Sequence, residues 1–353
     1  APHIQEIGPA LARKGFVVAA INYRRGWNPL LSAGPELQSS LVQAAYRGIQ
    51  DLRTCIRYFR YQADELGNTF KVDTNRIAAF GEHSGGYIVL GAATLDDYSK
   101  MTIPKLLLPP VPPSTTPIPM VLDFVFGDIH GTSYGILPDE NGNPIDTFCI
   151  PNHVGYSSDF HLAINLVGAI IDTFWIDEGQ IPIVSIHDKN AVEDPEKGGI
   201  VFTPEPLNQP IFEVFGSQTI QNVANDLGLN DVFKQSACLD NLGVDTMSTY
   251  LTLQAPGGVI DPWQYCVEPD TTCNNPAPSV AFVESYIDSL INFIVPRLYV
   301  GLDLCATGCD CLIMNTYRPE EIGMEIYPNP ATEAVQITTP GLPIEDIQLV
   351  DMS

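Results

Sequence analysis

A tight, glycine-flanked turn at residues 81–86 constrains the fold of this chain more than any other feature. The turn has the sequence Gly-Glu-His-Ser-Gly-Gly. The short apolar run at 76–80 before it predicts a buried strand, and the apolar run at 87–95 after it predicts a helix. Glycines suit such a turn because the residue at its apex has a strained backbone and the strand and helix approach closely. A strand, a tight turn and a helix in succession indicate an α/β protein.

Two registers place different residues at the apex of this turn. If Gly81 and Gly85 flank the apex, the apex residue is His83. If the register moves by one residue, the apex is Ser84, which would match the strand–turn–helix arrangement of G-x-S-x-G hydrolases. We favour His83, because the second register puts the bulky, ionisable Glu82 where a small residue is required. A glycine-rich turn without catalytic meaning remains the third interpretation.

The predicted elements alternate between helices and strands, which is typical of a doubly wound α/β fold. Helices are expected over 4–14, 39–66, 87–95, 210–227 and 279–298, and buried strands over 16–23, 76–80, 162–167, 181–186 and 249–254. The proline-rich stretch at 100–120 is expected to lack regular structure.

We divide the chain into three parts. Residues 1–300 form an α/β domain, with an insertion at about 100–158 in the position of a lid. A Cys-rich linker at 301–323 leads to residues 324–353, where period-2 alternation and proline turns predict part of a small β-sandwich. We expect N-terminal strands of the sheet to be missing, because the chain opens one helix before a strand.

Charge and hydropathy weigh against two classes of partner. The net charge of −25 argues against nucleic acid and anionic membrane surfaces. No apolar run reaches the roughly 18 residues that a transmembrane helix needs.

Polar residues suggest two minor sites, and each has a structural alternative. Asp139, Asn141 and Asn143 alternate as calcium ligands do, but Asn-Gly is above all a hairpin signal, so we expect no cofactor and keep structural calcium as the alternative. The eight cysteines include a cluster at 305–311 that suits a metal clip or disulfides. We favour disulfides formed in an oxidising compartment.

Residues 4–298 resemble the α/β-hydrolase superfamily, specifically its carboxylesterase and lipase-like branch. The residues that carry the resemblance lie at 15–24, 44–53, 73–86 and 181–187. The resemblance implies a mostly parallel, doubly wound sheet. It also implies a catalytic triad in the chain order nucleophile, acid, histidine.

The triad positions implied by the resemblance are substituted. The nucleophile position is His83, the acid position is Ala191 and the histidine position is Gly258. Asp188 or Asp194 could replace the acid, but no histidine follows residue 187, and the oxyanion loop of the family would precede residue 1. A serine hydroxyl without a positioned base is a weak nucleophile.

If the His83 register is right, His83 has a positive or strained φ and its ring points into the cleft. Ser84 is then the first residue of the helix, with its hydroxyl turned toward backbone amides. We read His187 as a core residue.

Residues 324–353 resemble the sorting domain of proteins exported by type IX secretion, through the run Tyr-Pro-Asn-Pro-Ala at 327–331. The resemblance implies the secretion machinery and cell-surface components as partners, with self-assembly possible in principle. The sequence therefore predicts a secreted, catalytically degenerate hydrolase-like protein with a surface, scaffold or binding role. The alternative is an active extracellular serine esterase that uses Ser84.

Overall fold

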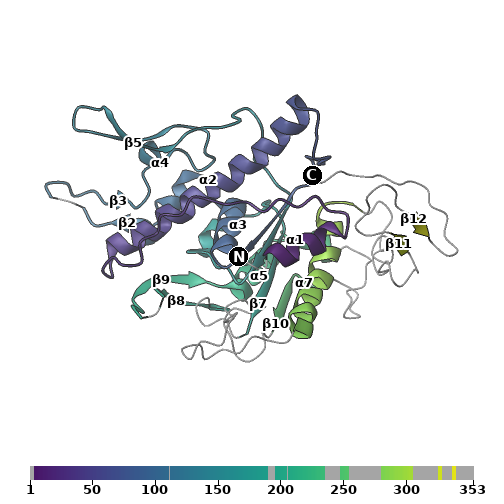
Figure 1. The fold of residues 1–353 in the computed structure, drawn as a ribbon. Coiled ribbons are helices and arrows are strands. Elements are labelled where there is room, and N and C mark those ends of the chain that lie inside the picture. The colour runs from purple at the N-terminus through teal and green to yellow at the C-terminus, as the bar shows by residue number, and fades with distance from the viewer. Residues whose placement is uncertain are drawn as a thin grey trace, which may run out of the picture.

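A four-stranded parallel sheet forms the centre of the molecule (Figure 1). The computed structural model describes residues 4–110, 112–189, 195–204, 206–234, 247–253, 280–304, 325–327 and 336–338. The strands follow the order β1-β6-β7-β10 and comprise β1 (Ala78–Glu82), β6 (Leu162–Leu166), β7 (Ile183–Asp188) and β10 (Tyr250–Leu253). Every neighbouring pair is parallel. All four strands lie within or next to the segments that the sequence predicts as strands.

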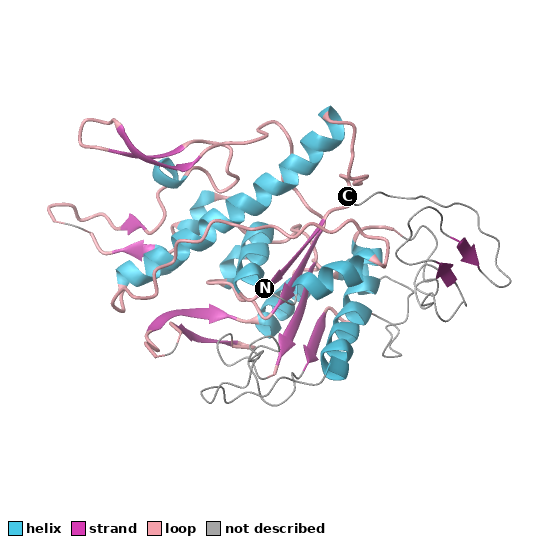
Figure 2. Ribbon diagram, viewed as in Figure 1, coloured by secondary structure: helices cyan, strands magenta, loops and turns pink. Residues whose placement is uncertain are grey.

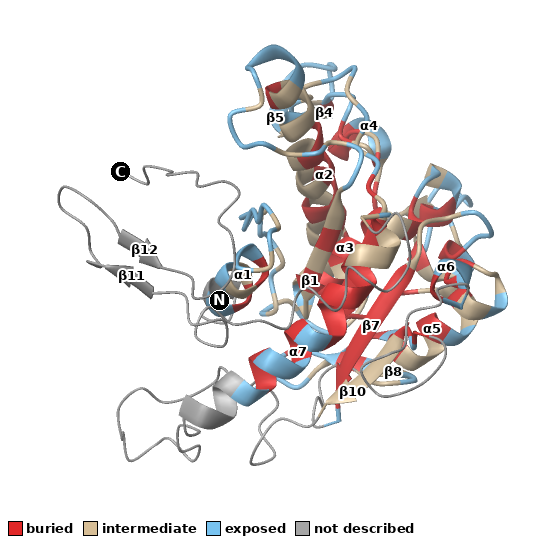
Figure 3. Ribbon diagram, turned by 90° about the vertical axis from the view of Figure 1, so that its right-hand side faces the viewer, coloured by how far each residue is buried: buried red, intermediate tan, exposed pale blue. Residues whose placement is uncertain are grey.

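Helices cover both faces of this sheet, as Figure 2 shows. On one face lie α2 (Pro35–Glu65), α3 (Ser84–Thr94) and α5 (Ser217–Asp226), and on the other lie α1 (Ile4–Ala12) and α7 (Val280–Gly301). Side chains of β6 alternate between the two sides: Ala163 packs with α2 and α3, whereas Leu162 and Ile164 pack with α1 and α7. The burial colours of Figure 3 show this sandwiched sheet. The mixed α/β class is therefore confirmed.

Helices α2 and α3 pack closely against each other on this face of the sheet. Pro35 starts α2 at a position where its missing N–H costs nothing. Gly48 on α2 lies against Ile88 of α3, and Gly91 on α3 lies against Ile49 of α2. A Cβ at either glycine would come within 2.5 Å of the facing isoleucine, so the small residues set the spacing of the two helices.

The insertion forms two small hairpins beside α2. The first contains β2 (Leu107–Leu108) and β3 (Ile118–Pro119), and two 3₁₀ helices, Tyr98–Met101 and Pro104–Leu106, precede it. After α4 (Asp123–Phe126), the second hairpin contains β4 (Gly135–Pro138) and β5 (Pro144–Cys149). The prediction that 100–120 lacks regular structure is thus only partly right, because short turns and two-residue strands tolerate its prolines.

One predicted element is wrong, and another is right only in its second half. Residues 16–23 are extended but belong to no strand, and Val17 and Val18 are 56% and 41% exposed. A strand needs a neighbour for its backbone groups, and no described strand pairs with this segment. The predicted helix over 210–227 is instead β9 (Pro210–Phe215) followed by α5. β9 pairs with β8 (Gly198–Phe202), a partner that local periodicity does not show.

The remaining described elements are short. A 3₁₀ helix, Thr173–Trp175, follows β6, and α6 (Asp231–Lys234) follows α5. Near the C-terminus, β11 (Glu325–Tyr327) and β12 (Gln336–Thr338) form an antiparallel pair within the segment predicted to be a β module. Among the described residues, no helix is long and apolar enough to cross a membrane.

Candidate functional site

His83 occupies the apex of the turn between β1 and α3. Its backbone has φ 46° and ψ −115°, a combination that L-residues rarely adopt. The turn is fixed on both sides: the His83 N–H donates to the Leu166 carbonyl at 2.9 Å, and the Tyr87 N–H donates to the His83 carbonyl at 3.1 Å. Ser84 is the first residue of α3. The predicted register and the positive φ are confirmed.

Close approach of neighbouring atoms requires glycine at positions 81 and 86, whereas a Cβ on Gly85 would meet no atom within 4 Å. A Cβ on Gly81 would lie 2.0 Å from the Gly85 carbonyl oxygen. A Cβ on Gly86 would lie 2.8 Å from the Gly168 Cα and 2.6 Å from the Asn165 Oδ1. These contacts leave no room for a larger residue at either position, which explains the glycines at 81 and 86.

Ser84 is exposed and its hydroxyl oxygen lies 2.8 Å from the Tyr23 hydroxyl oxygen. The prediction that this hydroxyl turns toward backbone amides is therefore wrong. Tyr23 comes from the extended segment at 16–28, which runs past the start of α3. Within the described part of the chain, Tyr23 is the one hydrogen-bond partner of the Ser84 hydroxyl.

The histidines of the insertion and the sheet make contacts with groups other than the Ser84 hydroxyl. His153 stacks on Tyr61, with ring centroids 4.7 Å apart. The Nδ1 of His161 accepts the Ile77 N–H at the start of β1, which is the opposite end of that strand from the β1–α3 turn. His130 lies beside the arginines of α2, and burial lowers the pKa of its imidazole. His187 is buried within β7, as predicted. None of these imidazoles reaches the Ser84 hydroxyl.

The acid candidates are only partly described. Asp188 is the last residue of β7 and is 2% exposed, and it lies at the same edge of the sheet as the β1–α3 turn. Ala191, Asp194 and Gly258 lie outside the described residues. The structure thus brings His83, Ser84 and Asp188 to the carboxyl ends of the strands. This edge is where ligands of open α/β sheets bind.

A buried polar network fixes the sheet beneath this edge. The Asn165 Oδ1 accepts the Gly168 N–H at 2.8 Å, and its Nδ2 donates to the Ser217 hydroxyl at 3.1 Å. Gln221 donates to the Ser185 hydroxyl at 2.9 Å. These bonds satisfy the polar groups of β6, β7 and α5, so we assign the network a structural role.

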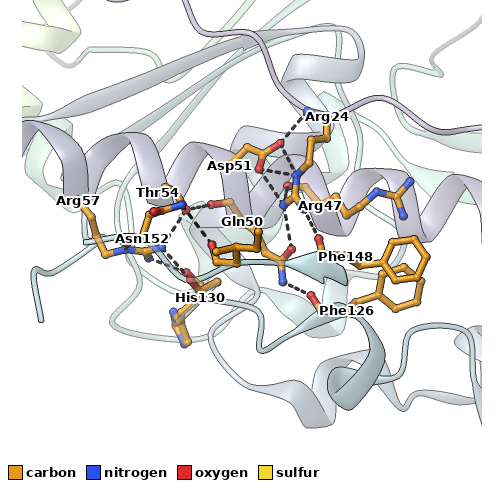
Figure 4. A network of polar contacts seen from close by, with 12 residues as sticks. Arg24, Arg47, Gln50, Asp51, Thr54, Arg57, Phe126, His130, Phe148 and Asn152 are labelled. Carbon is orange, nitrogen blue, oxygen red and sulfur yellow. Dashed lines mark hydrogen bonds and ion pairs between the residues drawn. The ribbon is translucent and has the colours of Figure 1, made fainter. Parts of the chain in front are cut away.

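A row of arginines on α2 holds the insertion in place, and Figure 4 shows part of this network. Arg53 donates to the carbonyls of Ile129, Ala92 and Leu95 at 2.6–3.0 Å. Arg57 donates to the carbonyls of His130, Gly131 and Asn152, and Arg60 donates to those of Thr74, Ser157 and Asp159. Sequence reasoning missed this row, although the spacing 53, 57, 60 places it on one helix face.

The arginine row makes the insertion a fixed cap. Arg53 is 4% exposed, and burial lowers the pKa of its guanidinium to about 10, so the group stays protonated at neutral pH. A buried charge of this kind is stable only with its full set of acceptors. Opening the insertion would break the bond from Arg53 to the Ile129 carbonyl and the bonds from Arg57 to the carbonyls of His130, Gly131 and Asn152. These contacts therefore favour an insertion that stays in place over one that moves as a lid.

The turn at 139–143 is a hairpin turn. The Asp139 Oδ1 accepts the N–H groups of Asn141 and Asn143 at 2.8 Å each, and its Oδ2 accepts the Asn143 side-chain N–H at 3.0 Å. These bonds close the loop between β4 and β5, so the Asp139 carboxylate stabilises the turn.

Two cysteines lie within the described part of the chain. Cys55 and Cys149 are free thiols, and burial raises the pKa of both. The other six cysteines, on which the disulfide prediction rests, lie outside the described residues. Within the residues described, no three His, Cys, Asp or Glu side chains are grouped to hold a metal ion.

Comparisons of the chain with protein-family models, with curated proteins and with solved structures gave no match.

Proposed function

We propose that this chain is a catalytically degenerate, α/β-hydrolase-like protein that binds a partner and does not hydrolyse esters. The observation that carries the proposal is His83 at the strained apex of the β1–α3 turn. A nucleophile elbow presents its nucleophile at this apex. Here the apex holds an imidazole, and the nearest serine belongs to the helix.

The chemistry of Ser84 supports the proposal. Its hydroxyl contacts the Tyr23 hydroxyl, whereas a triad serine contacts an imidazole that accepts its proton. The sequence contains no histidine after residue 187, where the hydrolase order would supply this base. Without a base, a serine hydroxyl does not react at a useful rate.

Sequence features support a location outside the cell. The run at 327–331 resembles a type IX sorting signal, and the cysteines cluster toward the C-terminus. We therefore propose a secreted or cell-surface protein with a binding or scaffold role.

The second candidate is an extracellular serine esterase that uses Ser84. The observation that favours it is the exposure of Ser84 at the carboxyl edge of the sheet, the edge that also holds Asp188. In this reading, Asp188 or Asp194 would act as the acid.

Ester hydrolysis separates the two candidates. The purified chain is assayed with p-nitrophenyl acetate and butyrate beside its Ser84→Ala and His83→Ala variants. We expect all three to release p-nitrophenol at the same rate as denatured protein. Turnover that is present in the wild type and lost in Ser84→Ala would refute the proposal and establish the esterase.

A further inference from the structure

A hollow of about 570 Å³ lies between the extended segment 21–24, the middle of α2 and the loop at 152–153. Its volume falls in the range of small-molecule sites. Tyr23 lines the hollow, and its hydroxyl contacts Ser84, so the hollow adjoins the elbow on the α2 side. Figure 4 shows Arg24, Asp51, Thr54 and Asn152 around this region.

The charges that line the hollow cancel each other. The Arg24 Nε donates to the Asp51 Oδ1 at 2.8 Å, and the backbone N–H of Arg24 donates to the Asp51 Oδ2 at 2.7 Å. The remaining guanidinium nitrogens donate to the Phe148 and Arg47 carbonyls and to Gln50. Because this ion pair is complete, the hollow offers no unpaired arginine for a phosphate or carboxylate ligand.

Aromatic rings form one wall. Tyr58 is 37% exposed, and the centroid of its ring lies 5.6 Å from that of His153, which stacks in turn on Tyr61. His153 has a φ of 52°, an unusual conformation for a residue other than glycine. The stack thus presents a rigid aromatic surface to the hollow.

Amide groups lie beside this aromatic wall. Asn22 is exposed, and its side chain forms no hydrogen bond with the described residues. Asn152 uses its Nδ2 to bond the Ile150 carbonyl, which leaves its Oδ1 as an acceptor. An amide supplies both donors and acceptors, as a ligand with many hydroxyl groups requires.

We propose that this hollow binds a neutral saccharide, with one sugar ring on Tyr58 and its hydroxyls on Asn22 and Asn152. A sugar ring has an apolar C–H face that packs on an aromatic ring and hydroxyls at its rim that bond to amides. The paired charges, the Asn22 amide and the Asn152 Oδ1 all match this chemistry. The inference gives a ligand class to the binding role proposed above and rests on that role.

The test uses the full chain and four neutral pentasaccharides: maltopentaose, cellopentaose, xylopentaose and chitopentaose. Isothermal titration calorimetry should show one-to-one binding of at least one of them with a dissociation constant of about 1 mM or tighter. Tyr58→Ala and Asn22→Ala should each weaken that binding by about fivefold or more. Tyr58→Phe keeps the ring and should bind within about twofold of the wild type.

Phe174→Ala is the matched control, because Phe174 is a 63% exposed aromatic residue that does not line the hollow. It should bind like the wild type. Circular dichroism checks that each variant is folded. If none of the four sugars binds, or if Tyr58→Ala and Asn22→Ala bind as well as the control, the inference is wrong. Ester turnover through Ser84 would refute the proposed function and leave saccharide binding in the hollow unaffected, so the two failures are distinguishable.

Discussion

The backbone of His83 predicts an unusual order of stability between two small substitutions. Alanine is normally preferred to glycine, because glycine loses about 0.5–1 kcal/mol more on folding. At φ 46° and ψ −115°, however, any residue with a Cβ carries a strain of about 1–3 kcal/mol. The difference leaves His83→Gly more stable than His83→Ala by about 1 kcal/mol. Both variants lose the imidazole, so its packing cancels in the comparison.

Ser84 supplies the matched control one residue away. Ser84 lies in the first turn of α3, where a helical backbone favours alanine over glycine. We therefore expect Ser84→Ala to be more stable than Ser84→Gly by about 0.5 kcal/mol. The loss of the Tyr23 contact is common to both variants and cancels in the same way.

Urea denaturation followed by far-ultraviolet circular dichroism measures both pairs. The reasoning requires opposite orders at the two positions: glycine above alanine at 83, and alanine above glycine at 84. If alanine is equal to or better than glycine at position 83, the strained apex is not at His83. If the two orders are exchanged, Ser84 is the apex and the elbow has the register of an active hydrolase.

Three further predictions concern the rest of the chain. Arg53→Met should lower the free energy of unfolding by about 3–5 kcal/mol, because it leaves three buried carbonyls without their donor at a cost of about 1–3 kcal/mol each, and an unchanged urea midpoint would contradict this. Because burial lowers the pKa of His130, the unfolded chain binds more protons below about pH 6.5 and stability falls there; His130→Gln should lose less stability than the wild type between pH 7.5 and pH 5.5 in thermal melts. Alkylation of the denatured, unreduced protein followed by mass spectrometry should modify Cys55 and Cys149, whereas the other six cysteines should react only after reduction; their modification without reductant would refute the disulfide prediction.

The sequence predicted those parts of the fold whose signals are local. The run at 76–80, the glycines at 81 and 85 and the apolar helix after them placed β1, the elbow and α3 within a few residues. The continuous apolar runs of β6 and β7 also indicated strands buried on both faces, and the structure confirms this burial.

Features that depend on distant partners were not predictable in the same way. The run at 16–23 has the composition of a buried strand, but composition does not show whether a neighbouring strand pairs with it. The sequence predicts a helix where β9 lies, because the partner strand β8 lies across a loop and the local sequence does not show the pairing. The contact of Tyr23 with Ser84 joins residues 61 positions apart, and no local pattern marks it.

Labelling with a fluorophosphonate probe tests the central claim most directly, because the probe reacts with a serine only when a base activates it. The full chain and its Ser84→Ala variant are incubated with the probe beside an active serine esterase as the positive control. We predict that the wild-type chain is labelled no more than the Ser84→Ala variant. Stoichiometric labelling of the wild type that disappears in Ser84→Ala would contradict the account and show that Ser84 is a working nucleophile.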